Sequence, residues 1–199
     1  TKDYWYPGCK GKTKDELAAM NKGRDFSKYV AYMHGQVREL LTGYGKVDIF
    51  WYDFTAQKPG VPWWDTFKHT ADWKGKELMA MTRKLQPGIV VNDRLGGEVP
   101  ADVVTPEQQK TFAWPTHGGR PAPAWETCQT FSGSWGYNRD EMTWKDLRQL
   151  LVMVIDNVSK GGNTILNVGP TGRGNFDARA RERLAGIGRW MGPNGRSVY

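Results

Sequence analysis

The sequence lacks the motifs that mark several common classes of protein. Only two of its 199 residues are cysteines. Cys9 and Cys128 lie far apart, so they build no disulfide scaffold and leave the redox compartment open. The three histidines form no HExxH or similar metal-binding cluster. No GxSxG nucleophile elbow occurs, and the glycines of residues 169–174 fit neither the Walker pattern nor GxGxxG. The chain therefore offers no motif for a zinc site, a serine-type triad or a phosphate loop.

Long apolar runs and a concentrated basic patch are missing as well. No run is long enough to cross a bilayer, so we predict no membrane partner. The first residues, TKDYWYPG, do not form a signal peptide, although a leader could have been removed. The 28 Lys and Arg exceed the 21 Asp and Glu, but they are scattered and no recognition motif accompanies them. We predict no nucleic-acid partner, and a solvated helix face for the group Arg179 to Arg183.

Aromatic residues, by contrast, are abundant, with 10 tryptophans and 8 tyrosines. Tryptophan is costly to place in an ordinary core because its N–H needs a hydrogen-bond partner. Clustered tryptophans often serve sugar-binding clefts, where flat rings stack on the apolar faces of pyranoses. The alternative is that most of the ten tryptophans have a purely structural role.

The stretch around which the chain is organised is residues 47–54, VDIFWYDF. It is short, apolar and rich in β-branched and aromatic residues, which is typical of a buried strand. Because side chains alternate along a strand, Ile49, Trp51 and Asp53 should share one face and Phe50 and Tyr52 the other. Asp53 then stands at the carboxyl end of the strand, where barrels of parallel strands place their chemistry. A terminal Asp that makes a turn or caps a helix is the alternative.

Helical and strand patterns alternate along the rest of the chain. Apolar spacing and capping residues predict helices at residues 14–20, 26–41 after an Asp25 cap, 73–85, 147–158 after a Thr143 cap, and 176–191 before a break at residues 193–195. Short apolar runs predict strands at residues 47–54, 89–92, 101–105, 124–130 and 164–168. Such alternation predicts an α/β fold with parallel pairing.

Functional-looking polar residues follow several of these strands, namely Asp53, Arg94, Glu107 and Glu126. That repetition is typical of the catalytic rim of a (β/α) barrel. A complete barrel needs about 250 residues, and an open parallel sheet would leave exposed edges. We therefore predict one truncated catalytic domain over residues 1–199, a partial TIM-type barrel of about five parallel strands that is completed by homo-oligomerisation, as a dimer or higher.

Two rim carboxylates suit the hydrolysis of a glycosidic bond. In retaining enzymes the two carboxyl groups stand about 5–5.5 Å apart, one as nucleophile and one as acid/base. Asp53 and Glu107 could meet this requirement, with Arg94 as the cation that favours the charged form of Asp53. The alternative for each acid is an ordinary surface carboxylate.

A series of segments then resembles the α-L-fucosidases of glycoside hydrolase family 29. The matching segments, in order, are YVAYMHGQVRELLTGYG, VDIFWYD, VVNDR, TPEQ, WETC, SWGYN, VSKGGNTILNVGPTGRG and MGPNGRSVY. Their number, order and spacing make the resemblance specific, and it spans nearly all of residues 25–199.

The resemblance implies a retaining exo-glycosidase with a (β/α)-type barrel, no metal or other cofactor, and fucosylated glycans or small fucosides as substrates. It assigns the nucleophile to Asp53 and the acid/base to Glu107, and it places Trp51 and Arg94 in the fucose pocket. Glu126 is the second choice for the acid/base and otherwise lines the site. It also suggests Trp135 as a residue that stacks against the aglycone.

The sequence also departs from the family pattern. Phe54 and Leu95 stand where members often have Gly and Trp. The N-terminal barrel strands, with their fucose-binding histidines, and the C-terminal β-sandwich have no counterpart. A catalytically inactive fucose-binding fragment is therefore the competing hypothesis, and a basic nucleic-acid binder is a third.

Overall fold

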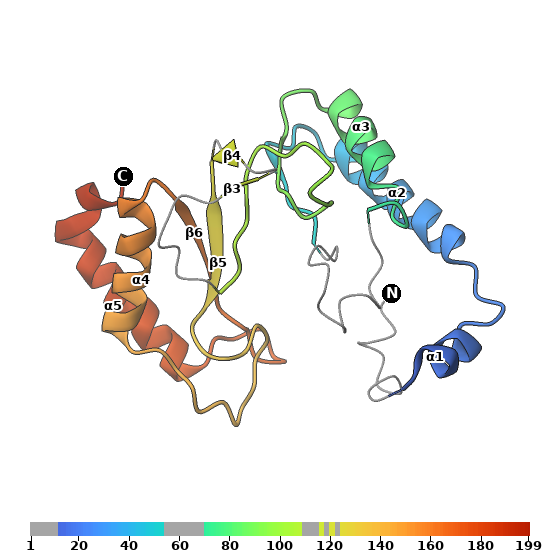
Figure 1. Cartoon of the computed structure of the whole chain (residues 1–199). Coiled ribbons are helices and arrows are strands. Elements are labelled where there is room, and N and C mark those ends of the chain that lie inside the picture. The colour runs from blue at the N-terminus through green and yellow to red at the C-terminus, as the bar shows by residue number, and fades with distance from the viewer. Residues whose placement is uncertain (1–11, 54–69, 109–115, 118–119, 122–123) are drawn as a thin grey trace. The chain divides into compact units, whose positions relative to one another are not determined.

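The computed structural model describes residues 12–53, 70–108, 116–117, 120–121 and 124–199 (Figure 1). Cys9 and Phe54 lie outside the described residues. The chain divides into two compact units, Thr1–Asp102 and Val103–Tyr199, and each is described by itself. The expectation of a single domain over residues 1–199 stays a prediction.

The helices of the first unit form where the apolar spacing predicts them. They are α1 (Lys14–Met20), α2 (Phe26–Gly43) and α3 (Gly75–Leu85). Asp25 caps α2 as predicted, because its carboxylate accepts a hydrogen bond from the Ser27 amide. Val30, Val37 and Leu41 form the buried part of the α2 stripe, and α2 lies beside α3 (Figure 1).

The strands of the first unit are short and parallel. Strand β1 (Ile49–Phe50) pairs with β2 (Val90–Val91), with Ile49 opposite Val90. The predicted alternation of faces holds, since Ile49 is 62% exposed whereas Phe50 packs against the core. This parallel pairing confirms the α/β class and sets the direction in which residues 51–53 leave the sheet.

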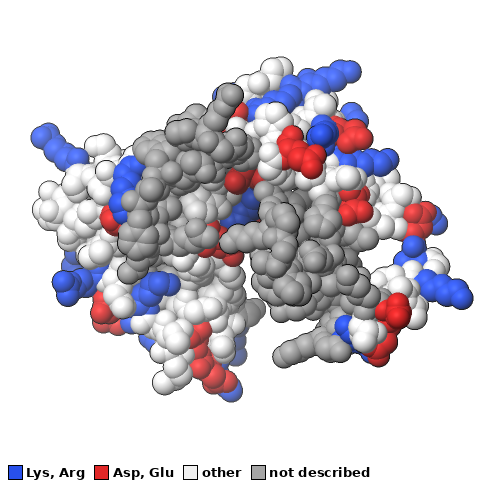
Figure 2. Space-filling view, in the orientation of Figure 1, with Lys and Arg blue, Asp and Glu red and all other residues white. Residues whose placement is uncertain are grey.

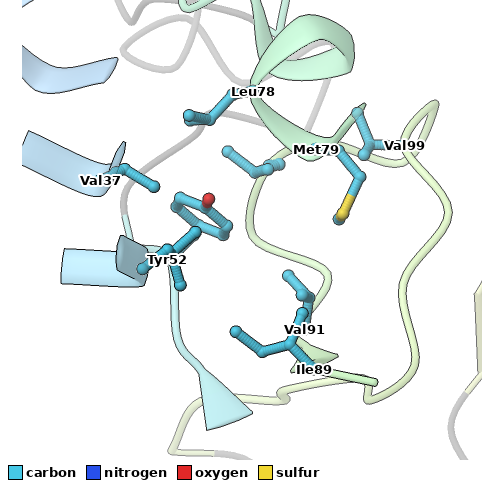
Figure 3. Packing of buried hydrophobic residues seen from close by; sticks show 9 residues of the cluster. Val37, Tyr52, Leu78, Met79, Ile89, Val91 and Val99 are labelled. Carbon is cyan, nitrogen blue, oxygen red and sulfur yellow. The ribbon is translucent and has the colours of Figure 1, made fainter. Parts of the chain in front are cut away.

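The core of the first unit lies between this sheet and helices α2 and α3. Figure 3 shows the ring of Tyr52 among the side chains of Val37, Leu78 and Met79. Tyr52 is only 7% exposed, although it stands between two residues of the predicted site. Burial raises the pKa of the Tyr52 phenol to about 12, while its hydrogen bond with Thr82 partly opposes that shift.

The second unit contains the longest parallel pairing of the described chain. Strand β5 (Glu126–Thr130) runs beside β6 (Asn163–Asn167) with Glu126 opposite Asn163. Isolated parallel bridges join Val104 to Trp125 and Glu107 to Cys128, so the predicted strand at residues 101–105 forms bridges here rather than a continuous strand. The short antiparallel strands β3 (Thr116–His117) and β4 (Arg120–Pro121) lie in a region predicted as loop.

The helices α4 (Leu147–Ser159) and α5 (Ala178–Asn194) lie side by side next to this sheet, and η1 (Gly195–Ser197) follows α5 (Figure 1). The predicted Thr143 cap is wrong. Asp146 caps α4, because it forms a capping box in which its carboxylate accepts from the Gln149 amide. The predicted break at residues 193–195 is confirmed, since α5 ends at Asn194 and η1 follows from Gly195, although Pro193 itself lies inside the helix.

Two arginines of the group predicted as a solvated helix face, Arg179 and Arg183, make contacts within the fold, whereas Arg181 is exposed as predicted. Arg179 donates to the Glu141 carbonyl and lies over the Trp144 ring, with its guanidinium carbon 4.5 Å from the ring centroid. Arg183 donates to the Lys145 carbonyl at 2.5 Å. The two side chains therefore fasten the segment before α4 onto α5.

Candidate active site

Three of the six predicted site residues meet in the first unit. Asp53 follows β1, and Arg94 follows β2 by three residues. The Arg94 Nη1 donates to Asp53 Oδ1 over 3.0 Å, and the Arg94 guanidinium carbon lies 4.4 Å from the centroid of the Trp51 ring. The parallel register of β1 and β2 thus brings a carboxylate, a guanidinium and an indole together at one end of the sheet. We call these residues the Asp53 corner.

The Asp53 corner is open on one side and packed on the other. The Asp53 side chain is 58% exposed, whereas the Arg94 side chain is 17% exposed. A guanidinium held between an aromatic face and a carboxylate has a fixed orientation, because both contacts are directional. The corner therefore presents an oriented, accessible carboxylate oxygen beside a fixed positive charge.

The indole of Trp51 adds a hydrogen-bond donor. Its Nε1 is buried and has no hydrogen-bond partner within the part of the chain that the structure describes. Buried indole N–H groups normally have an acceptor. The described residues therefore leave the Trp51 indole N–H without an acceptor.

Sequence reasoning missed Asn92 at this corner. Its side chain forms two hydrogen bonds with the backbone of Tyr52, and it is only 2% exposed. The one available signal was a polar residue that ends the apolar run 89–91, two positions before Arg94. That signal marks a buried polar group but does not identify its partner.

The other three predicted residues lie in the second unit. Glu107 is exposed and sits at the isolated bridge to Cys128, and Glu126 begins β5. Gln108, directly after Glu107, adopts a φ of +53°, and its side chain donates to Thr130 Oγ1 over 2.8 Å. Trp135 is 41% exposed in the loop after β5.

The most strongly perturbed carboxylate of this unit is one that the sequence did not single out. Glu141 is 8% exposed and accepts hydrogen bonds from Ser134 Oγ at 2.6 Å and from the Thr143 amide at 2.7 Å. Bonds from Ser134 and Thr143 lower the pKa of Glu141 to about 2. Glu141 closes the loop that carries Trp135, and all its near partners belong to that loop or to α5, so its role is structural.

Leu95, which stands where family members often have Trp, is a core residue. Leu95 is 4% exposed and belongs to the hydrophobic core of the first unit. It therefore does not line the open side of the Asp53 corner. Phe54, the other departure, lies outside the described residues.

The described residues show a mixed surface charge and no cluster of metal ligands. Lys and Arg are interspersed with Asp and Glu on the face that Figure 2 shows. No group of three or more His, Cys, Asp or Glu that could hold a metal ion occurs among residues 12–53, 70–108 and the described part of 116–199. Within the same residues, none of the helices has the length and apolar character that a bilayer crossing requires.

Parallel strands followed by helices, with a carboxylate and a guanidinium at the strand ends, define an α/β protein of the kind that places its site at the carboxyl edge of a sheet. The family model described as "Alpha-L-fucosidase" matches residues 2–196. The chain belongs to the alpha-L-fucosidase family.

Individual relatives agree with this assignment. The tissue alpha-L-fucosidase of Bos taurus is 30% identical over 183 residues, covering 82% of this chain and 34% of that protein. The tissue alpha-L-fucosidase of Homo sapiens is 28% identical over 172 residues, with the same coverage. The chain therefore spans about a third of the length of these relatives.

Solved structures give the same picture. Alpha-L-fucosidase isoenzyme 1 from Paenibacillus thiaminolyticus is 35% identical, with a TM-score of 0.77 over 91% of this chain and 43% of that chain. The alpha-L-fucosidase from Vibrio sp. strain EJY3 is 28% identical, with a TM-score of 0.66 over 82% of this chain and 27% of that chain. The structural neighbours are fucosidases, which have a TIM-type catalytic domain.

Proposed function

We propose that this chain carries the catalytic machinery of a retaining exo-acting α-L-fucosidase. Its substrates would be fucosylated glycans or small fucosides with a terminal α-L-fucosyl group. The observation that carries the proposal is the Asp53 corner, in which Arg94 holds an exposed carboxylate beside the Trp51 ring. Family membership supports the choice of sugar.

In the first step, an Asp53 carboxylate oxygen forms a bond to the anomeric carbon of fucose while the glycosidic C–O bond breaks. Glu107 gives its proton to the departing oxygen. Asp53 is positioned for this role by Arg94, which lies on one side of the carboxylate and leaves the other side open. Glu126 is the second choice for the proton donor and otherwise lines the site.

In the second step, water attacks the anomeric carbon and the bond to Asp53 breaks. Glu107, now ionised, takes the proton from that water, so both acids return to their starting states. Trp51 and Arg94 contact the fucosyl group, and Trp135 stacks against the aglycone.

We also propose that the exposed β1 face around Ile49 is covered by a second copy of the chain, giving a homo-oligomer. An active monomer in sedimentation would contradict this last point.

Replacement of Asp53 by Ala tests the proposal. Release of nitrophenol from a nitrophenyl α-L-fucoside should fall by about 10⁴-fold or more, because the nucleophile is lost. Added azide should restore release by attacking the same carbon. Asp48→Ala is the matched control, since Asp48 precedes β1, is exposed and pairs with Lys46. Undiminished activity of Asp53→Ala without azide would refute the assignment.

A further inference from the structure

We propose that Asn92 is a positioning residue. It orients the proposed nucleophile, Asp53, by hydrogen bonding to the backbone of Tyr52, which lies between Trp51 and Asp53. The inference rests on the proposed function, because it concerns how the side chain of Asp53 is oriented for its step. It adds a residue whose side-chain hydrogen bonds go to the backbone of Tyr52. Its effect passes entirely through Tyr52.

The Asn92 side chain forms two hydrogen bonds with the backbone of Tyr52. The Tyr52 amide donates to Asn92 Oδ1 over 2.9 Å, and Asn92 Nδ2 donates to the Tyr52 carbonyl over 2.8 Å. The orientation of the amide is fixed by chemistry, since only its nitrogen can donate to a carbonyl. A paired contact of this kind constrains both the position and the rotation of the Tyr52 peptide groups.

The side chain of Tyr52 is held at its far end as well. The Tyr52 hydroxyl lies 2.6 Å from Thr82 Oγ1, and Thr82 Oγ1 donates its own proton to the Leu78 carbonyl over 2.9 Å. The tyrosine must therefore be the donor in the first bond. Thr82 is fully buried on α3, so residue 52 is fastened to the sheet through its backbone and to α3 through its ring.

Fixing residue 52 also fixes its two neighbours. Side chains alternate along an extended chain, so Trp51 and Asp53 point away from the face that Tyr52 buries. On that opposite face Arg94 meets both of them, at 4.4 Å from the Trp51 ring centroid and 3.0 Å from Asp53 Oδ1. Asn92 and Arg94, two residues apart, therefore hold the backbone and the side chains of one tripeptide.

The test compares Asn92→Leu with Asn157→Leu in the full chain. Asn157 is the matched control, because it is also 2% exposed and its side chain also donates a hydrogen bond, to Thr164 Oγ1 in the second unit. Leucine has a similar size but leaves the Tyr52 peptide groups without their partner. Asn92→Ala is the second variant. It also removes both hydrogen bonds to Tyr52, but it places no large apolar side chain against the Tyr52 peptide groups.

Two readouts report on positioning. The first is the rate constant for covalent labelling by an α-L-fucosyl fluoride with fluorine at C2, followed by intact mass. Fluoride needs little protonation to leave, so this rate depends chiefly on the nucleophile. The second is the ring-current shift of the Arg94 side-chain protons in NMR spectra, which reports on the Arg94–Trp51 contact without any turnover.

We expect Asn92→Leu to slow labelling by about 10- to 100-fold, as small misplacements of a reacting group do, and to abolish the Arg94 ring-current shift. Asn92→Ala should show the same changes to a smaller extent, and Asn157→Leu neither. A folded Asn92 variant that keeps both the labelling rate and the shift would overturn the inference. If the unaltered chain is not labelled, the proposed function fails, and the shift alone then decides whether Asn92 positions the corner.

Discussion

The segment that follows β1 and the loop that follows β5 each fix the position of a carboxylate, but they leave it exposed to different extents. At the Asp53 corner a single guanidinium contacts an acid that is 58% exposed. In the loop after β5, Glu141 is 8% exposed and accepts from Ser134 and Thr143. The first carboxylate keeps oxygen lone pairs available, whereas the second uses them within the protein.

The contrast explains why we propose Asp53 rather than Glu141 as the nucleophile, although the pKa of Glu141 is lowered to about 2. Hydrogen bonds from Ser134 and Thr143 hold the pKa of Glu141 near 2, which keeps it ionised and also occupies the oxygens that a substrate would need. Structural ion and hydrogen-bond networks perturb pKa values as readily as catalytic sites do. Access to the carboxylate oxygen, and a cation that leaves it open, distinguish Asp53.

The largest effect expected in a further test belongs to Glu107, the proposed proton donor. Glu107→Gln should lower turnover of an alkyl fucoside by about 10²- to 10⁴-fold, because its leaving oxygen needs a proton. Turnover of a nitrophenyl fucoside should fall less, since nitrophenolate leaves more easily. Glu126→Gln is the comparison variant, and a leaving-group dependence found there instead of at Glu107 would transfer the role to Glu126.

The next largest effect concerns the cation of the Asp53 corner. Arg94→Met should lower kcat/KM by about 10²- to 10³-fold, because a fixed charge beside the reacting carboxylate is lost. Arg94→Lys should recover little, since an ammonium cannot stack and donate as a planar guanidinium does. Arg139→Met is the control, because Arg139 is exposed and pairs only with its neighbour Asp140 in the ion pairs of the described chain. Equal effects of Arg94→Met and Arg139→Met would remove the special role of Arg94.

A smaller effect, on stability rather than turnover, is expected at Glu141. Its pKa in the folded chain is about 2 and its ordinary value is 4.5, so ionised Glu141 stabilises the fold above about pH 4.5. That stabilisation is lost as the pH falls from about 4.5 towards 2. Urea denaturation between pH 6 and pH 3 should show a shallower loss of stability in Glu141→Gln than in the unaltered chain.

Ser134→Ala removes the bond that lowers this pKa most and should give an intermediate slope. Identical slopes in all three proteins would show that Glu141 does not hold the loop. A loss of stability that appears only above pH 6 would contradict the sign of the shift.

The smallest effect is expected at the loop that Glu141 holds. Trp135→Ala should weaken discrimination between aglycones by about two- to tenfold in KM, the scale of one lost aromatic contact. Phe176→Ala is the control, since Phe176 is 44% exposed, close to the 41% of Trp135, but lies just before α5. Equal KM changes in both variants would exclude a specific aglycone contact.

Much of the local structure could be predicted from the sequence because it depends on local spacing. The apolar stripe and Asp25 cap define α2, and the alternation around Asp53 separates the Tyr52 face from the Asp53 face. The Arg94–Asp53 neighbourhood also follows, because both residues leave adjacent parallel strands.

The parts that could not be predicted depend on contacts between distant residues. The hydrogen bonds between Asn92 and Tyr52 join positions 40 residues apart, and no spacing rule relates them. The α4 cap was wrong because Thr143 looked like a cap from sequence alone, whereas its hydroxyl is bonded to Glu141. Arg179 and Arg183 looked solvated because the sequence cannot show that Trp144 lies against them.

The most direct test of Asp53 as the nucleophile is the site of covalent labelling in the unaltered chain. After reaction with an α-L-fucosyl fluoride that carries fluorine at C2, peptide mapping by mass spectrometry identifies the acid that forms the glycosyl ester. We predict one fucosyl group per chain, on Asp53. A label on Glu107, Glu126 or Glu141, or a folded chain that takes up no label, would contradict it.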